Sequence, residues 1–342
     1  MVNIKLSGQK RFLNLSIYQK ESILRILSDQ LIWIILIFLF IIISIVEPIF
    51  LSRINIINIL LHSAVLGIMV IGESICLISG KFDLSIESTL GFTAMLGAIL
   101  VVDFGWNPYL TILLVLGLGI FIGYLNSLMI IKLKIDPFVV TLGMLIVLRG
   151  LSLVISGGYT RYNFPSAFKF FAAHTKNGLI SVPILLMLFC YVVFSTILYR
   201  QKFGRHLYAV GGNIDAAYTS GVNVSKVITK AFLISGFLAA LSGLVLSSRL
   251  NSVPTTLGKG MVFEVMAAAV IGGISLQGGR GSLLGALGGV LLMSSIDSAL
   301  TLTRVSAFWV ETSKGLLLLT AVFLDTLKIR LVPLLRRSWL ED

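Results

Sequence analysis

The feature that most constrains this chain is its series of long apolar segments. An α-helix rises about 1.5 Å per residue, so about 20 apolar residues cross the ~30 Å hydrocarbon core of a bilayer. Backbone groups in lipid must be satisfied within the segment, which favours helices, and these segments lack the alternation of membrane β-strands. The sequence therefore predicts an all-α, polytopic transmembrane helical bundle of about ten spans, over residues 31–47, 57–79, 84–102, 109–131, 138–157, 179–198, 228–248, 264–276, 282–301 and 313–327.

The composition excludes an ordinary soluble protein. Of the 342 residues, 57% are hydrophobic and 12% are charged, and the mean hydropathy is +1.00. A soluble domain carries about 25% charged residues, and so few charges could not cover its surface in water. Cys76 and Cys190 both lie within apolar segments, which indicates buried small residues rather than a disulfide framework.

Basic residues predict the orientation of the bundle. Those in the termini and in alternate connections outnumber those on the opposite side by about two to one, which places both termini in the cytoplasm of a bacterial inner membrane. This distribution explains the net charge of +12 without a nucleic-acid partner. Residues 1–30 are expected to be a cytoplasmic segment, with an amphipathic helix over 12–27 on the lipid surface. Residues 31–330 form the transmembrane domain and residues 331–342 a cytoplasmic tail.

Two helix entries resemble each other within the chain. The segment 87–91, ESTLG, opens the third predicted span, and the segment 281–285, GSLLG, opens the ninth. Each follows a glycine-containing break after a helix that runs inward, which favours an internal duplication in parallel orientation. The alternative is that small residues recur in any helical bundle.

The largest cytoplasmic connection, residues 203–225, has the signals of a short helix. Asn213 is a good N-cap, Asp215 suits the positive end of the helix dipole, and Gly221 suits a left-handed stop. We expect a glycine-bounded helix at the cytoplasmic surface that fits a groove on another protein; a solvated loop is the alternative. Its candidate residues are Gly204, Arg205, Gly212, Asn213, Asp215, Ala216, Ala217 and Gly221.

A second glycine-rich stretch covers residues 272–282. It lacks the G-x-x-x-x-G-K-[ST] pattern that binds nucleotide phosphates, and that pattern occurs nowhere in the chain. We therefore expect close helix packing and a sharp turn. The candidate packing glycines are Gly272, Gly273, Gly278, Gly279, Gly281 and Gly285.

A few polar residues fall within or next to the predicted spans, where they usually face the bundle interior or a water-filled path. We expect Asp83 or Ser85 to cap the third span at the membrane interface, and a buried carboxylate that relays protons is the alternative. Arg149 is expected to pair with a carboxylate or to bind a sugar hydroxyl. The candidate pathway or gating residues are Asp83, Ser85, Asn126, Arg149, Glu264 and Asp297.

The sequence gives little support for catalysis. The histidines His62, His174 and His206 lie on different predicted elements, and no metal-binding spacing such as H-E-x-x-H occurs. A G-x-S-x-G nucleophile elbow is also missing from the sequence. We therefore expect neither a catalytic residue nor a metal or cofactor site in this chain.

Four stretches together carry a specific resemblance: ISGKFDLSIES at 78–88, DPFVVTLGMLIVLRGLSLVISGG at 136–158, FGRHLYAVGGNIDAAYTSGVNV at 203–224 and FEVMAAAVIGGISLQGGRGSLLGALGG at 263–289. With them the chain resembles, over about residues 31–330, the permease subunits of bacterial ATP-binding-cassette importers for ribose and other simple sugars. The autoinducer-2 importer permeases belong to the same group. Lys81 and Glu87 depart from the pattern, because the family usually has glycine at both positions; they add bulk and charge at a helix entry.

The resemblance implies a multi-subunit importer. A second permease subunit, identical or paralogous, would complete the pathway in the membrane lipid. A cytoplasmic ATPase would bind ATP and Mg and dock on the 203–225 loop, and a periplasmic or lipid-anchored sugar-binding protein would deliver the solute.

Two other classes compete with the importer. A self-contained, ion-coupled secondary transporter requires essential carboxylates within the membrane, of which Asp297 is the one expected to lie deep. An intramembrane enzyme requires a nucleophile and a base on neighbouring spans, and no such pair is evident in the sequence.

Overall fold

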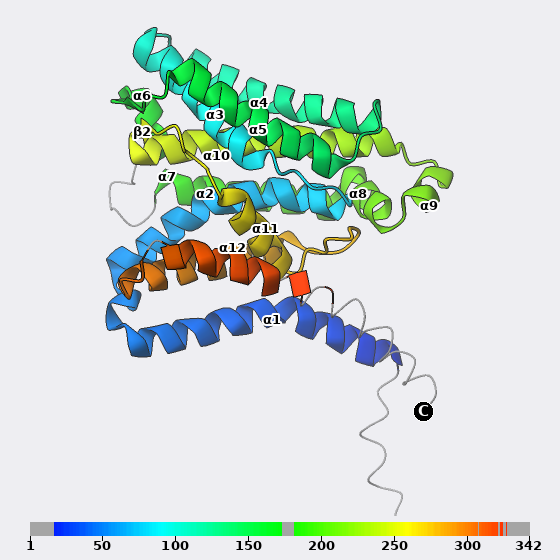
Figure 1. Ribbon diagram of the computed structural model, residues 1–342. Helices are drawn as coiled ribbons and strands as arrows, with labels where there is room; N and C mark the ends of the chain where they lie inside the picture. The colour runs from blue at the N-terminus through cyan, green and yellow to red at the C-terminus, as the bar shows by residue number, and fades with distance from the viewer. Residues whose placement is uncertain (1–16, 173–180, 307, 321, 324–325, 327–342) are drawn as a thin grey trace, which may run out of the picture.

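The computed structural model describes residues 17–172, 181–306, 308–320, 322–323 and 326. His174, residues 1–16 and the tail 331–342 lie outside the described residues. The helices pack side by side into an elongated bundle, with α8 (Lys202–Gly212) and α9 (Ile214–Thr219) at one end and α6 (Ser166–Lys169) at the other (Figure 1).

The remaining elements follow one another along the bundle. The other helices are α1 (Ile17–Val46), α2 (Arg53–Ile78), α3 (Ile86–Ala98), α4 (Pro108–Ile131), α5 (Pro137–Ser156), α7 (Val182–Arg200), α10 (Val224–Leu250), α11 (Met261–Ile271) and α12 (Leu283–Leu302). The short elements are η1 (Pro48–Leu51), the π-helical η2 (Ile99–Asp103), η3 (Phe170–Ala172) and the strands β1 (Arg161–Tyr162) and β2 (Ser252–Val253). The strands pair antiparallel, with Arg161 opposite Val253.

Seven helices among the described residues are long and apolar enough to cross a bilayer, and they coincide with seven of the predicted spans. The predicted first span is the apolar end of α1, a helix that runs without a break from Ile17 to Val46. The predicted eighth span, 264–276, is shorter than expected because α11 ends at Ile271. The predicted tenth span overlaps a helix over residues 308–320, and part of it lies outside the described residues.

Local sequence signals explain where several helices begin. The side chain of Ser52 caps α2 by accepting a hydrogen bond from the backbone N–H of Asn55, and Asn107 and Asp136 cap α4 and α5 in the same way. In both of the latter helices a proline follows the cap, at the position where its missing N–H costs nothing. Gly157, with a φ of 62°, ends α5 in the left-handed region.

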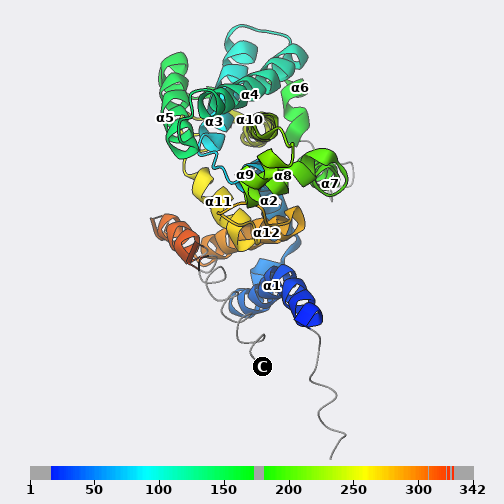
Figure 2. The ribbon, with the colours of Figure 1, turned by 90° about the vertical axis from the view of Figure 1, so that its right-hand side faces the viewer.

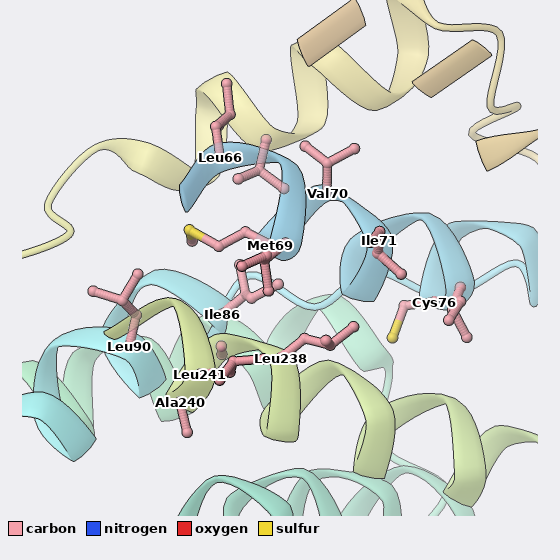
Figure 3. Packing of buried hydrophobic residues seen from close by; sticks show 14 of the residues in the cluster. Leu66, Met69, Val70, Ile71, Cys76, Ile86, Leu90, Leu238, Ala240 and Leu241 are labelled. Atoms are coloured by element: carbon pink, nitrogen blue, oxygen red, sulfur yellow. The ribbon is translucent and has the colours of Figure 1, made fainter. Parts of the chain in front are cut away.

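The centre of the bundle is formed by α2 and α10, which the end-on view places between α4 and α5 on one side and α1 on the other (Figure 2). Their side chains, including Met69 of α2 and Leu238 of α10, belong to one buried hydrophobic cluster with Leu90 of α3 (Figure 3). Cys76 and Cys190 are buried and free, as the sequence predicts. Because these three helices are enclosed, the polar groups they carry lie away from the surrounding lipid.

Two glycines bring α4 and α10 into backbone contact. A Cβ added at Gly119 would lie 2.3 Å from the carbonyl oxygen of Gly236, and one at Gly123 would lie 2.1 Å from that of Phe232. No side chain larger than hydrogen fits at either position without moving a backbone. By contrast, Gly117 on the same helix has nothing within 4 Å of an added Cβ.

We predict that Gly119→Ala destabilises the protein by about 1–3 kcal/mol, because the new methyl group overpacks the α4–α10 contact. Gly117→Ala is the matched control and should be neutral or stabilising by up to about 1 kcal/mol, since alanine is the better helix former. Thermal unfolding of the detergent-purified variants measures both. Equal melting temperatures for the two variants would contradict the close crossing.

Candidate functional site

The candidate site at one end of the bundle is the pair of helices α8 and α9, here called the coupling element (residues 202–221). The side chain of Asn213 caps α9 by accepting a hydrogen bond from the N–H of Ala216 at 2.9 Å, and Asp215 lies in the first turn. Gly221 has a φ of 82°, and the N–H groups of Gly221 and Val222 donate to the carbonyls of Tyr218 and Ala217. These two bonds form a Schellman stop, so α9 has the predicted start and end.

The first half of the coupling element is more ordered than the sequence suggested. Residues 202–212 form the helix α8, which buries Leu207 and Val210 against the bundle. A Cβ at Gly204 would lie 2.0 Å from the carbonyl oxygen of Leu198, so glycine allows α8 to fold closely onto the end of α7. Arg205 extends back to the carbonyl of Arg200 at 3.4 Å.

The exposed face of α9 contains apolar side chains. Tyr218 is 73% exposed and Ile214 is 39% exposed, and these two residues, one turn apart, share a face of α9. Ala216 is exposed on another side of the helix. Ala217, in contrast, is buried against the protein's own core. A surface helix that exposes a tyrosine and an isoleucine is suited to contact another protein.

Backbone contacts join the coupling element to the bundle at a point we call the glycine junction (Gly80, Gly211, Gly212, Gly278 and Gly279). A Cβ at Gly211 would lie 1.8 Å from the carbonyl oxygen of Ile78, and one at Gly278 would lie 2.8 Å from the Cα of Gly80. The N–H of Gly279 donates to the carbonyl of Ile78 at 2.9 Å. The ends of α2 and α8 and the turn after α11 therefore meet with no side chain between them.

A tyrosine adds a second link between the same segments. Tyr208 of α8 donates its hydroxyl to the carbonyl of Gly281 at 2.8 Å. Burial raises the pKa of Tyr208 to about 12, so the phenol stays protonated and available as a donor at physiological pH.

The other predicted packing glycines have two different roles. Gly272 and Gly285 face each other across α11 and α12, since a Cβ at Gly285 would lie 2.2 Å from the carbonyl oxygen of Gly272. Gly273 differs from the expectation: nothing lies within 4 Å of an added Cβ, and its φ of 91° is what requires glycine. Gly281, with a φ of 128°, is restricted both by conformation and by contact with Ile274.

Asp83 is the centre of a buried hydrogen-bond network in the non-helical segment 79–85 between α2 and α3. Its Oδ1 accepts from the N–H and the hydroxyl of Ser85 at 3.2 and 2.6 Å, and its Oδ2 accepts from the hydroxyl of Ser235 at 2.6 Å. Asn126 of α4 donates to the Ser85 hydroxyl at 2.8 Å. The network therefore attaches an irregular backbone segment to α4 and α10.

This arrangement corrects the expected role of Asp83 and Ser85. Ser85 occupies the N-cap position of α3, but its side chain makes no capping hydrogen bond. Both side chains are almost fully buried rather than interfacial. Asp83 and Ser85 bind each other and neighbouring helices because a non-helical segment inside the bundle has polar groups to satisfy.

Glu73 of α2 is a deep carboxyl group that the sequence analysis overlooked. It is fully buried, its Oε1 accepts from the N–H of Asp83 at 3.4 Å, and its Oε2 has no hydrogen-bond partner. In the sequence, the local sign of a buried carboxyl group is one acidic residue within an apolar span. The contact with Asp83 arises only because the chain turns back after α2.

Glu87 and Arg149 form an ion pair between α3 and α5, which is the carboxylate pairing expected for Arg149. The second carboxylate oxygen of Glu87 accepts a hydrogen bond from the N–H of Val262 at 3.1 Å. Val262 lies in the first turn of α11, a helix whose own N-cap, Gly260, has no side chain to offer. Glu87 therefore caps α11 from another helix, a role that no sequence pattern revealed.

A third polar cluster lies on α11, α12, α2 and the 308–320 helix. Lys314 contacts the carboxylates of Glu264 and Asp297, the latter at 3.5 Å, and His62 lies 3.8 Å from Asp297. One ligand atom from each of His62, Glu264 and Asp297 falls within a 4.8 Å group, which is compatible with a metal site. However, the ammonium group of Lys314 already contacts both carboxylates, so its one positive charge offsets part of their negative charge.

The seven long apolar helices among the described residues define a multi-pass membrane protein. The chain belongs to the family described as "Branched-chain amino acid transport system / permease component", which matches residues 55–324.

Three curated proteins similar to this chain are named as import permeases. The chain is 38% identical over 292 residues to the ribose import permease protein RbsC of Bacillus subtilis, covering 85% of this chain and 90% of the relative. It is 36% identical over 304 residues to the ribose import permease protein RbsC of Haemophilus influenzae, covering 88% and 94%. The autoinducer 2 import system permease protein LsrC of an Enterobacter species is 34% identical over 279 residues, covering 82% and 81%. No solved structure matches the chain.

We predict that Asp83→Ala destabilises the protein by about 3 kcal/mol or more, because it leaves the buried hydrogen-bonding groups of Ser85 and Ser235 without an acceptor. Asp83→Asn should recover most of this loss, since the amide can accept at one end and donate to the Ser235 hydroxyl at the other.

Asp136→Ala provides the matched control, because this exposed N-cap of α5 should cost only about 1 kcal/mol. Denaturation of the three variants in detergent compares them. A smaller loss for Asp83→Ala than for Asp136→Ala would show that the buried network does not stabilise the fold.

Proposed function

We propose that this chain is the membrane-spanning permease subunit of an ATP-binding-cassette importer that carries a simple sugar into the cytoplasm. The observation that carries the proposal is the coupling element, whose exposed face contains Tyr218 and Ile214 and whose base touches the bundle through the glycine junction. A cytoplasmic partner that moves α8 and α9 therefore acts directly on the ends of α2 and on the turn after α11.

The partners of the proposed importer follow from this role. A cytoplasmic ATPase pair binds ATP and Mg and docks on the coupling element. A second permease subunit, identical or paralogous, completes the pathway, and a periplasmic or lipid-anchored binding protein delivers the solute. The relatives named for ribose and autoinducer 2 import support a simple sugar as the solute class.

The proposed topology has ten crossings with both termini in the cytoplasm of a bacterial inner membrane. Besides the seven long helices, the crossings are the apolar part of α1, the helix over 308–320, and α11 together with the non-helical residues 254–260. An 11-residue helix is about 16 Å long, roughly half of the hydrocarbon core, so the non-helical segment must complete that crossing. The non-helical breaks before α3 and α12 support the proposed internal duplication.

The membrane-embedded polar residues are proposed to act in gating. Asp83, Ser85 and Asn126 attach the segment 79–85 to its neighbours, and Glu264 and Asp297 attach the 308–320 helix through Lys314. The first attachment joins a non-helical segment to its neighbouring helices, and the second joins a peripheral helix to the bundle. Segments held in this way can shift as rigid units between inward-open and outward-open states.

An ion-coupled secondary transporter is the competing function. The buried carboxyls of Glu73 and Asp83 favour it, because such groups often relay protons or bind sodium. The two functions differ in their energy source, so one reconstitution separates them.

The test is reconstitution with the ATPase and binding protein encoded by neighbouring genes. We expect the three proteins to purify as one complex, the ribose-loaded binding protein to stimulate ATP hydrolysis, and ribose to accumulate in proteoliposomes only with ATP. Accumulation by this chain alone under a proton or sodium gradient would overturn the proposal.

We predict that Tyr218→Ala and Ala216→Arg abolish association with the ATPase while membrane insertion and melting temperature stay unchanged, because both side chains are exposed on α9. Ala217 is unsuitable for this test because its buried position would make a larger residue disrupt the fold.

Tyr199→Ala is the matched control, since Tyr199 is 61% exposed at the end of α7 and outside the coupling element. Co-purification of the ATPase measures association for all three variants. Loss of the ATPase from Tyr199→Ala, or its retention by both α9 variants, would contradict docking at α9.

A further inference from the structure

A cavity of about 200 Å³ lies between α3, α5 and the non-helical segment 254–260 that leads into α11. It lies beside the first turns of α3, where this non-helical segment packs closely against the helix. Gly91 allows this approach, because a Cβ there would lie 2.6 Å from the carbonyl oxygen of Leu257. Interrupted helices that meet within the membrane are where transporters commonly bind their solutes.

One wall of the cavity is polar and fixed. Glu87 is held by Arg149 and by the N–H of Val262, and only 3% of its side chain is exposed. The side chain of Arg149 is 39% exposed, so its guanidinium has N–H groups left for a second partner. Ser152 lies one turn after Arg149 on the same face of α5 and also lines the cavity.

The remaining walls combine an aromatic ring with hydroxyl groups. Phe92, Leu153 and Leu257 provide apolar surface, and Thr255 and Thr256 provide hydroxyls. A few oriented polar groups within a largely apolar lining are typical of small-molecule sites. A lining that combines an aromatic ring with a guanidinium–carboxylate pair suits a molecule with one C–H face and several hydroxyl groups.

We propose that this cavity is a contact site for the transported polyhydroxylated solute, in which Arg149 and Ser152 bind its hydroxyls and Phe92 packs against its ring. The proposal rests on the proposed function and adds a position in the pathway to it. Glu87 is a positioning residue here, because its carboxylate orients Arg149 and fixes the start of α11.

The first test measures access to the cavity with a single cysteine. Thr256→Cys is introduced into the complete importer in proteoliposomes; the native Cys76 and Cys190 are buried and do not compete for a membrane-impermeant thiol reagent. We expect ribose-loaded binding protein to slow labelling at least fivefold compared with ribose-free binding protein. Tyr159→Cys, which is exposed and outside the cavity, should label at the same rate in both conditions.

The second test separates solute contact from folding. Arg149→Lys and Ser152→Ala should raise the KM for ribose uptake about tenfold with little change in its kcat, because a contact made to the bound solute is weakened. Arg161→Lys is the control, since Arg161 pairs with Asp103 outside the cavity, and its KM should not change.

The outcomes distinguish the two proposals. Uptake of ribose with unprotected Thr256→Cys and unchanged KM values would overturn the contact site and leave the importer standing. If the unmodified complex hydrolyses ATP but accumulates no ribose, the proposed sugar import fails, and the contact site fails with it.

Discussion

The structure depends on one constraint: a backbone that leaves the helical conformation inside a bilayer must find other hydrogen-bond partners. The chain does so after α2, where Asp83 accepts three hydrogen bonds, and before α11, where Glu87 accepts one from the first turn of the helix. Both carboxylates lie in or beside α3. This helix therefore holds the two irregular segments in place, and the cavity of the proposed solute site lies where one of them, residues 254–260, packs against α3.

The same arrangement connects the two ends of the molecule. The coupling element meets α2 at the glycine junction, α2 leads into the segment anchored by Asp83, and that segment opens α3. Glu87, in the first turn of α3, reaches the start of α11. A displacement at the end that carries α8 and α9 therefore has a continuous route, through covalent chain and hydrogen bonds, to the region of the cavity.

Much of this organisation could be predicted from local sequence. The long apolar segments identified seven helices, and Asn213 and Gly221 marked the start and end of α9 because capping depends on residues a few positions apart. What could not be predicted were pairings between distant residues: Glu73 with Asp83, Glu87 with the start of α11, and Lys314 with Glu264 and Asp297. The end of α11 at Ile271 could not be predicted either, since hydropathy does not distinguish an apolar helix from an apolar non-helical segment.

The glycine junction has a mechanical consequence. A contact between two long side chains can absorb a small shift by changing rotamers, but Gly211, Gly278 and Gly80 have none to change. Their backbones lie against one another, so a shift of α8 by a fraction of an ångström either moves the neighbouring segments or opens a gap between them. Because no side chains lie in this contact, it is stiff, and a small displacement of α8 is transmitted almost completely to the neighbouring segments.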